Sequence, residues 1–295
     1  MTKRTVTALA LVTLAATAVY LPVLSSLVSQ WASDENYSHG FLIVPFAIYF
    51  AWAGRESLAA APLGPSAAGL IIVCGSLILL IAGLFGAELF LARISLIGVL
   101  AGTVLFLFGS QHLRLLAFPI ALLVLMVPLP ALVFNQIAFP LQLFASRVGE
   151  LVLTTAGIPV LREGNILELS TTKLEVAQAC SGIRSLVSLV TLGVILGKLN
   201  EPRRWARAVL AFVAIPIAIV ENAARVAGTG VAAHWIGPEA AEGFLHTFSG
   251  WVMFVLAFGL LLLTQRALAR GWPRAVHGPR AIQEGSGPST MVLPS

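Results

Sequence analysis

Long apolar stretches separated by short polar segments run through most of the sequence. A membrane-spanning helix needs about 20 predominantly apolar residues, and eight stretches reach or approach that length. They cover residues 6–28, 40–53, 67–85, 94–110, 113–130, 181–197, 207–228 and 247–264. The second stretch is short, and we interpret it as a tilted or broken span, or one partly buried among its neighbours. The pattern predicts an all-α membrane protein, a polytopic helical bundle of about eight transmembrane helices.

One further stretch, 131–156, does not fit this pattern. It is apolar overall, but five polar side chains recur in it at roughly helical spacing: Asn135, Gln136, Gln142, Arg147 and Glu150. Such a helix suits the membrane interface or a re-entrant position better than a lipid-exposed span. If it did span, the topology of everything after it would invert.

Composition supports the bilayer as the main solvent of this chain. Hydrophobic residues make up 58% of the sequence and charged residues only 11%, whereas a soluble domain carries roughly 25% charged residues. The net charge of +5 would suggest nucleic acid in a soluble protein. In a membrane protein it indicates cytoplasmic loops and anionic lipids, so we expect membrane lipids as partners and no nucleic acid.

The distribution of basic residues orients the chain through the positive-inside rule. With eight spans and a cytoplasmic N-terminus, twelve of the eighteen Lys and Arg residues fall in cytoplasmic segments. These are Lys3, Arg4, Arg55, Arg114, Lys198, Arg203, Arg204, Arg207, Arg266, Arg270, Arg274 and Arg280. The densest group, 198–207, occupies a short loop between two strong spans, where the rule applies best.

Three segments then face outward: 30–40, 157–179 and 229–246. In the middle one, apolar and polar residues alternate from Ile166 to Ser170 and again from Lys173, with a polar turn between the two runs. This pattern predicts a small outward-facing β-hairpin lying on the membrane.

The two ends of the chain are distinct from the bundle. The basic start and the apolar run to about Val28 resemble a signal peptide without a convincing cleavage site, and we interpret them as an uncleaved signal anchor. The end is rich in Gly, Pro and Ser without periodicity, as in disordered segments. We therefore expect a polytopic transmembrane domain over 1–270 and a disordered cytoplasmic tail over 271–295.

Cys180 lies where the polar outer segment gives way to an apolar span. A helix that starts here would place its positive dipole end at the thiol and favour the thiolate. Arg184 is four residues further on, one helical turn away on the same face, and would lower the thiol pKa in the same direction. The alternative is a small buried hydrophobe, which we prefer for Cys74, in the middle of another apolar stretch.

A second group of ionisable residues lies near the outer end of the stretch 207–228. Glu221 and Arg225 are four residues apart and can pair on one helix face. Ionisable groups at membrane depth are costly and point into a bundle or a wet cavity. They are either a structural ion pair or a functional pair in which Glu221 orients Arg225 towards a substrate carboxylate or an oxyanion.

His246 directly precedes the last predicted span, again at the outer face, and histidine is the usual proton carrier near neutral pH. Cys180, Arg225 and His246 thus come from three helices but fall on one side of the membrane. Nucleophile, cation and proton carrier are the groups that thiol acyl transfer needs. A metal site made from Cys180, His39 and His246 is an alternative, but no tightly spaced ligand pair supports it.

Four motifs, in this order, resemble the exosortase/archaeosortase family: WASDENYSHGFLIVP around His39, ACSGIRSL around Cys180, ENAARV around Arg225 and FLHTFSGW around His246. The resemblance covers about residues 20–265. Members of this family are multi-spanning membrane cysteine transpeptidases. They process exported proteins that carry a C-terminal sorting signal, made of a short motif (Pro-Glu-Pro in the bacterial type), a transmembrane helix and a basic tail.

The resemblance implies specific roles for these residues. Cys180 is expected to be the nucleophile, Arg225 an active-site cation and His246 the proton-transfer residue. Residues expected to support them are Arg184, Glu221, Asn222, His39 and Ser181. The expected location is the bacterial inner membrane with the site facing the periplasm, and no cofactor or metal is expected.

Two other classes of function stay open at this point. A transporter or channel would line a polar path with Glu221, Arg225 and His39, but the middles of the predicted spans are almost entirely apolar. A non-enzymatic assembly factor for envelope export is the other alternative.

Overall fold

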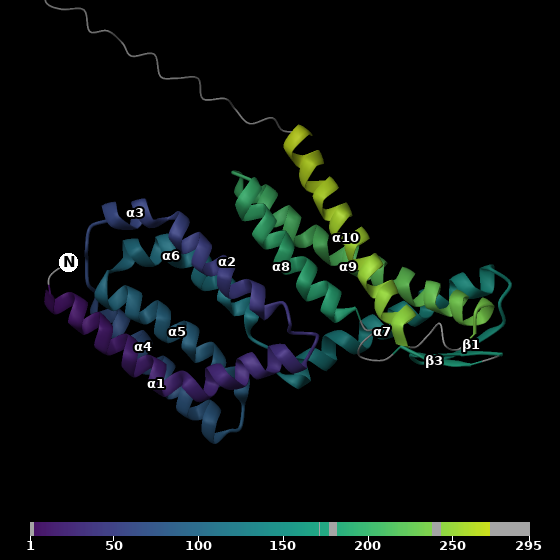
Figure 1. Ribbon diagram of the computed structural model, residues 1–295, viewed down its shortest axis with the longest axis horizontal. Coiled ribbons are helices and arrows are strands. Elements are labelled where there is room, and N and C mark those ends of the chain that lie inside the picture. Colours follow the sequence, from purple (N-terminus) through teal and green to yellow (C-terminus); the bar gives the residue numbers. More distant parts are fainter. Residues whose placement is uncertain (1–2, 171, 177–181, 238–242, 272–295) are drawn as a thin grey trace, which may run out of the picture.

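The computed structural model describes residues 3–170, 172–176, 182–237 and 243–271 (Figure 1). Within these ranges it describes side chains except those of residues 3–13, 16 and 243–247. The helices are α1 (Lys3–Ser33), α2 (Gly40–Ala53), α3 (Arg55–Ala60), α4 (Ala67–Phe85), α5 (Leu89–Leu107), α6 (Ser110–Leu122), the 3-10 helix η1 (Leu123–Met126), α7 (Ala131–Thr155), α8 (Ile183–Asn200), α9 (Arg204–Trp235) and α10 (Gly243–Gly271). The strands β1 (Val160–Glu163), β2 (Ile166–Leu169) and β3 (Lys173–Glu175) lie between α7 and α8.

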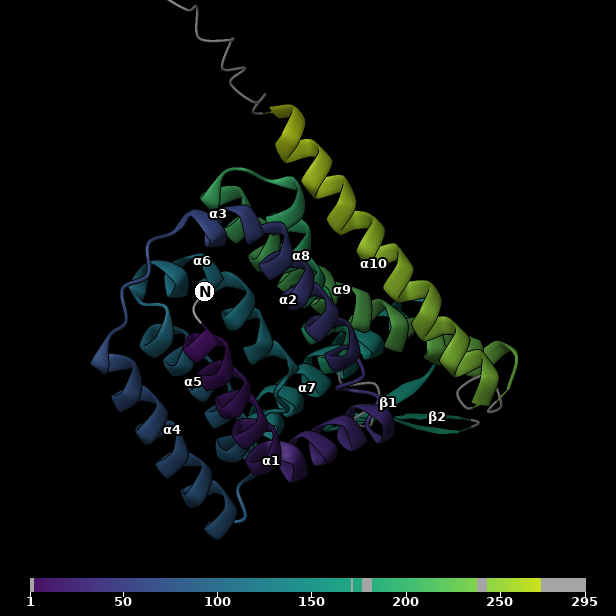
Figure 2. The same ribbon diagram turned by 60° about the vertical axis from the view of Figure 1, so that its left-hand side comes forward.

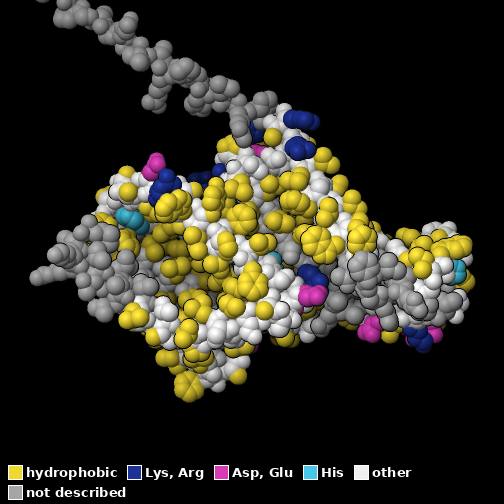
Figure 3. Space-filling view, in the orientation of Figure 1, with side chains coloured by type: hydrophobic (Ala, Val, Ile, Leu, Met, Phe, Trp, Pro, Cys, Tyr) yellow, Lys and Arg dark blue, Asp and Glu magenta, His cyan; other side chains and the backbone are white. Residues whose placement is uncertain are grey.

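The helices confirm the prediction of a multi-pass, all-α membrane protein. Six helices within the described ranges are long and apolar enough to cross a bilayer: α4, α5, α7, α8, α9 and the part of α10 from Phe248. Two apolar segments, α2 and the continuous α6–η1, are shorter. In Figure 3 hydrophobic side chains cover most of the bundle, while charged side chains gather at its upper end, near the lower ends of α8 and α10, and over the sheet at the lower right. Such a distribution places the middle of the bundle in hydrocarbon and its ends in water.

Several helices extend beyond their predicted bounds. Helices α2 and α4 match the predicted stretches 40–53 and 67–85, but α9 continues to Trp235 and α10 begins already at Gly243. The predicted ranges mark where side chains are apolar, whereas an α-helix satisfies its own backbone in water as well as in lipid. His246 therefore belongs to the first turn of α10 and does not precede this helix.

The chain folds back on itself between α6 and α8. Pro128 and Asn135, on either side of the start of α7, line the same cavity as Asp34 and Tyr37. At the start of α8, Arg184 pairs with Glu35 of the same connection between α1 and α2. The segment thus leaves from and returns to one side, and in Figure 1 α7 runs across the lower ends of α8 and α10. This geometry favours the interfacial or re-entrant interpretation of α7, in which the topology after it does not invert.

The predicted hairpin is part of a three-stranded antiparallel sheet. Strands β2 and β3 form the predicted hairpin, with Glu168 opposite Lys173, and β1 pairs with the other edge of β2. The prediction missed β1 because its four residues are too few for a periodic signal. The buried face of the sheet contributes Leu167 and Val176 to a cluster with Leu153 of α7 and Val226 of α9.

The two ends of the bundle differ in their polar groups. We call the end that carries the sheet the sheet side and the opposite end the far side; Figure 2 shows the sheet at one end only. On the far side, Gln265 of α10 donates a hydrogen bond to the buried Glu201 between α8 and α9 (3.1 Å). Arg207 of α9 donates to the Glu201 carbonyl oxygen (2.7 Å). The dense basic group at 198–207 therefore lies on the side opposite the sheet.

Candidate functional site

Three polar residues of the ENAARV motif lie on the sheet-side half of α9. Glu221 and Asn222 are buried, at 7% and 3% exposure, and Arg225 is partly buried. Asn222 and Arg225 are three residues apart, so they occupy the same face of the helix. This face of α9 is the framework of the candidate site, because the two other motif segments contact it.

The segment that contains Cys180 contacts α9 at Asn222. Gly182, two residues after Cys180 and directly before α8, has φ +76°. A Cβ atom at Gly182 would lie 2.6 Å from the Asn222 Cγ atom. The backbone here is therefore pressed against the Asn222 side chain in a conformation and at a distance that only glycine allows.

Cys180 and Ser181 lie outside the described residues, but covalent geometry limits their distance from α9. Consecutive Cα atoms are about 3.8 Å apart, so the Cα of Cys180 lies within about 7 Å of that of Gly182. On the other flank, Val176 is buried against Val226 of α9. Both flanks of 177–181 thus contact α9 within about one turn of Arg225. We predicted a helix that starts at Cys180. Helix α8 starts three residues later, at Ile183.

The segment that contains His246 contacts α9 at Arg225. The Arg225 guanidinium carbon lies 3.4 Å from the point that a Cβ at Gly250 would occupy. Gly250 is on α10, one turn after His246, and residues four apart in an α-helix share a face about 6 Å from each other. The structure does not describe the His246 side chain. Position 246 is on the same face of α10 as Gly250, the face that Arg225 contacts.

Arg184 has a partner that sequence spacing did not predict. Its guanidinium forms an ion pair with Glu35, from the WASDENYSHG segment. The pairing ties the start of α8 to the connection between α1 and α2. The structure therefore gives Arg184 a carboxylate partner, while Arg225 lies against the helix that carries His246.

Glu221 and Asn222 hold buried oxygen atoms next to this arrangement. Glu221 faces Ser185 of α8 and Arg225. The Asn222 Oδ1 makes no hydrogen bond within the described part of the chain.

His39 is buried and contacts the backbone at the end of η1. It is 7% exposed, and its Nε2 lies 3.2 Å from the Leu125 carbonyl oxygen at the end of η1. Burial lowers the pKa of the His39 imidazole, against a smaller opposing effect of that carbonyl. The neighbouring Trp31 donates to the Met126 carbonyl oxygen (3.0 Å). These two contacts fasten the sheet-side end of α1 and α2 to η1.

The remaining candidate groups do not join this arrangement. Cys74 is exposed on the apolar surface of α4, so the prediction of a buried hydrophobe was wrong. The apolar pattern could not tell a side chain that faces lipid from one that faces the protein core. Among the described side chains, no group of three or more His, Cys, Asp or Glu residues is placed to hold a metal ion.

Sequence reasoning missed the two glycines that bring the motifs together. Gly182 and Gly250 both lie inside motifs, in ACSGIRSL and FLHTFSGW, but they carry no chemical group that would attract notice. The available signal was their type: a glycine beside candidate catalytic residues often marks a close approach of backbone to side chain.

Comparisons with known proteins identify the family. The comparison with curated proteins and the comparison with solved structures find no match. The profile described as transmembrane exosortase matches residues 31–263, a range that contains all four motifs and every helix from α2 to α9. The chain belongs to the transmembrane exosortase family.

Proposed function

We propose that this protein is a membrane cysteine transpeptidase that cleaves the C-terminal sorting signal of exported proteins. Its catalytic residues are Cys180, Arg225 and His246, and its substrates carry a short motif, a transmembrane helix and a basic tail of the PEP-CTERM type. Family membership supports the class of protein, and the geometry around α9 supports the choice of residues.

The observation that carries the proposal is the meeting of three motifs at one turn of α9. Asn222 contacts Gly182, two residues from Cys180, and Arg225 contacts Gly250, one turn from His246. The motifs that carry the thiol, the guanidinium and the imidazole thereby lie close to each other at α9, although they are far apart in sequence. This is the set that cleavage through a thioester requires.

The reaction proceeds in two steps. In the first, the Cys180 thiolate forms a C–S bond to the scissile carbonyl, and Arg225 stabilises the oxyanion of the tetrahedral intermediate. The C–N bond then breaks, and His246 donates its proton to the departing amine, which leaves a thioester. In the second, an incoming amine, hydroxyl or water loses its proton to His246 and attacks the thioester, and the C–S bond breaks to regenerate the thiolate.

The proposed orientation follows from the charges on the two sides. The basic 198–207 segment lies on the far side, and basic loops stay in the cytoplasm. We therefore assign the far side to the cytoplasm of a bacterial inner membrane. The sheet side, with Cys180, then faces the periplasm, where exported substrates are encountered.

The test is co-expression of the full chain with a tagged substrate that carries a sorting signal. Wild-type protein should cleave the tag, and rapid acid quenching should trap a substrate acyl group on the peptide that contains Cys180, visible by mass spectrometry. Cys180→Ala should abolish both signals while the protein stays in the membrane at normal amounts. Normal processing by Cys180→Ala would refute the proposed chemistry.

The second cysteine provides an internal control. A charged, membrane-impermeant maleimide should label Cys180 from the periplasmic side at neutral pH, whereas Cys74 lies on an apolar helix surface and should stay unlabelled. Cys74→Ala should cleave substrate like wild type. Transport or passive assembly would require no reactive thiol, so an unreactive Cys180 would favour one of those two functions.

A further inference from the structure

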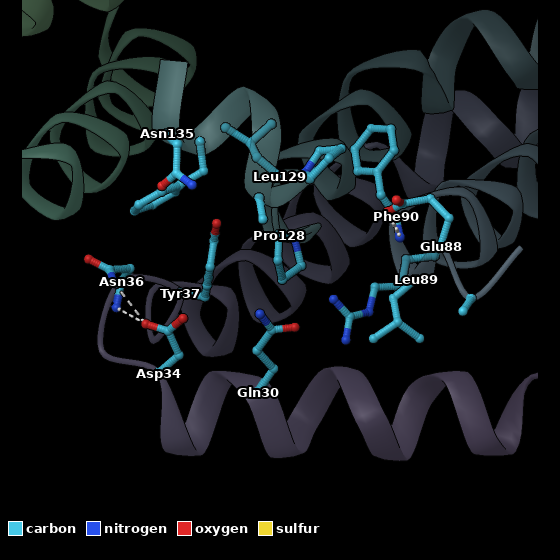
Figure 4. A pocket seen from close by; sticks show the side chains of 15 residues that line it. Gln30, Asp34, Asn36, Tyr37, Glu88, Leu89, Phe90, Pro128, Leu129 and Asn135 are labelled. Carbon is cyan, nitrogen blue, oxygen red and sulfur yellow. Dashed lines mark hydrogen bonds between the residues drawn. The ribbon is translucent and has the colours of Figure 1, made fainter. Parts of the chain in front are cut away.

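A polar cavity lies at the sheet-side end of α1 and α5, apart from the residues proposed for catalysis. Its volume is about 410 Å³, within the range of small-ligand sites. Figure 4 shows Gln30, Tyr37 and Asn135 reaching into it from α1, the α1–α2 connection and α7. Asp34, Glu88 and Arg93 also line it. None of these residues belongs to the proposed reaction.

Arg93 gives this cavity a buried positive charge, and no carboxylate among the described side chains forms an ion pair with it. Its residue exposure is 3%. Its Nη2 donates to Ser26 Oγ (3.2 Å), its Nε has no hydrogen-bond partner, and it takes part in none of the ion pairs found among the described residues. A buried guanidinium at the end of a membrane helix is costly unless an anionic group compensates it. The cavity therefore has a place for an anionic group beside Arg93.

Asp34 and Glu88 give the same cavity two negative charges. Asp34 Oδ1 accepts from the Asn36 backbone and side-chain nitrogens (both 2.9 Å), and Glu88 Oε1 accepts from the Phe90 backbone nitrogen (3.4 Å). Each carboxylate thus caps a turn with one oxygen and has another oxygen left. A purely anionic ligand would be repelled by both groups, and a purely cationic ligand would leave Arg93 uncompensated. A ligand with one group of each sign can compensate Arg93 and pair with one of the two carboxylates.

We propose that this cavity binds the zwitterionic headgroup of a phospholipid that carries a primary ammonium group, such as phosphatidylethanolamine. The phosphate lies against Arg93 and the Gln30 amide, and the ammonium lies against Asp34, which Figure 4 shows on the opposite side of Gln30 from Glu88. Leu89 lines the cavity at the start of α5 and is 49% exposed, so it can contact the acyl chains. Binding does not depend on Cys180 or on the proposed cleavage.

The test measures which phospholipids the purified, full-length protein retains. The protein is reconstituted in nanodiscs with equal amounts of phosphatidylethanolamine, phosphatidylcholine and phosphatidylglycerol, then released, and bound lipid is counted by native mass spectrometry. Wild type should retain the ethanolamine lipid in preference to both others. The choline lipid has a similar charge but no N–H donor, and the glycerol lipid lacks the cation.

Variants that remove charges test whether Asp34, Glu88 and Arg93 determine which lipid is retained. Asp34→Asn with Glu88→Gln keeps an oxygen for each cap but removes both negative charges. It should shift the ratio of bound glycerol lipid to ethanolamine lipid by roughly tenfold towards the glycerol lipid. The control is Glu163→Gln with Glu175→Gln, which removes two exposed charges on the sheet and should leave the ratio as in wild type. Arg93→Leu, checked for a monodisperse fold, should lose retention of all three lipids.

Three results would overturn the proposal. The first is equal retention of the three lipids by wild type. The second is an unchanged lipid ratio in the variant at Asp34 and Glu88. The third is complete displacement of the bound lipid by soluble phosphoethanolamine at equal concentration, which would make a free zwitterion the occupant.

Discussion

Asn222 and Gly182 are in direct contact across α9 and the start of α8: a Cβ on Gly182 would lie 2.6 Å from the Asn222 Cγ atom. This contact sets how closely the segment that carries Cys180 approaches the helix that carries Arg225. The neighbouring contact between Arg225 and Gly250 does the same for the helix that carries His246. Two glycine contacts thus connect three motifs.

Gly182→Ala should impair cleavage severely. The left-handed conformation at φ +76° costs a non-glycine residue about 1–2 kcal/mol, and the new methyl group would also clash with Asn222. The Cys180 segment would have to move away from α9, and a displacement of about 1 Å can lower a rate about a hundredfold. The measurement is cleavage of the tagged substrate, normalised to the amount of protein in the membrane.

Gly164→Ala is the matched control for that experiment. Gly164 has φ +64°, but a Cβ there would meet no atom within 4 Å. It should show the backbone strain alone, as a small loss of thermal stability with cleavage retained. If the two variants lose activity equally, the contact with Asn222 has no special role.

Arg225→Lys should lose far more activity than Arg184→Lys. Lysine keeps the charge at either position but lacks the planar fork of arginine. An oxyanion donor is worth about a hundredfold to a thousandfold in kcat, which is the loss expected at Arg225. At Arg184 the substitution keeps an ion pair with Glu35, which is 74% exposed in its side chain, so a loss below about tenfold is expected.

The comparison of the two arginines also decides which one acts on Cys180. Measuring the rate of maleimide labelling against pH gives the thiol pKa in each variant. If Arg184→Lys, and not Arg225→Lys, raised that pKa and removed activity, the roles of the two residues would be reversed.

The sequence predicts those parts of the fold that depend only on the requirements of the lipid bilayer. Helices such as α2 and α4 follow from apolar composition alone, because every backbone group in hydrocarbon must be satisfied within its own segment. Strand β1 was missed, since four residues between a helix and a tight turn give no periodic pattern. The return of the chain after α7 also depends on long-range contacts, such as that of Arg184 with Glu35.

In the candidate site, too, the sequence identifies the individual residues but not the long-range contacts between them. Cys180, Arg225 and His246 were selected by chemistry and by a common side of the membrane, and both are readable from sequence. Which arginine serves the thiol was not readable, because helical spacing takes no account of a carboxylate 149 positions earlier in the chain, at Glu35. The cavity at Arg93 was missed for a similar reason: its walls come from α1, α5, α7 and three connections.

Gly250→Leu should reduce cleavage by displacing Arg225. A Cβ at Gly250 would already lie 3.4 Å from the guanidinium carbon, so the larger side chain would occupy the space of the guanidinium. Gly259→Leu is the control on the same helix, because a Cβ there meets no atom within 4 Å. Activity near that of wild type in Gly250→Leu would show that Arg225 does not need its place against α10.

Acidification should loosen the attachment of α2 to η1 through His39. Burial lowers the pKa of His39 below its usual value near 6.5, so the unfolded chain binds a proton before the folded protein does. Stability is therefore full above pH 6.5 and falls as the pH drops from there towards the folded-state pKa. The slope is at most about 1.4 kcal/mol per pH unit for one proton.

The measurement is the midpoint of thermal unfolding in detergent from pH 8 to pH 5, compared with His39→Gln. The amide of Gln keeps a donor for the Leu125 carbonyl but does not titrate, so this variant should have a flatter profile. Parallel profiles for the two proteins would exclude His39 as the origin of the acid sensitivity.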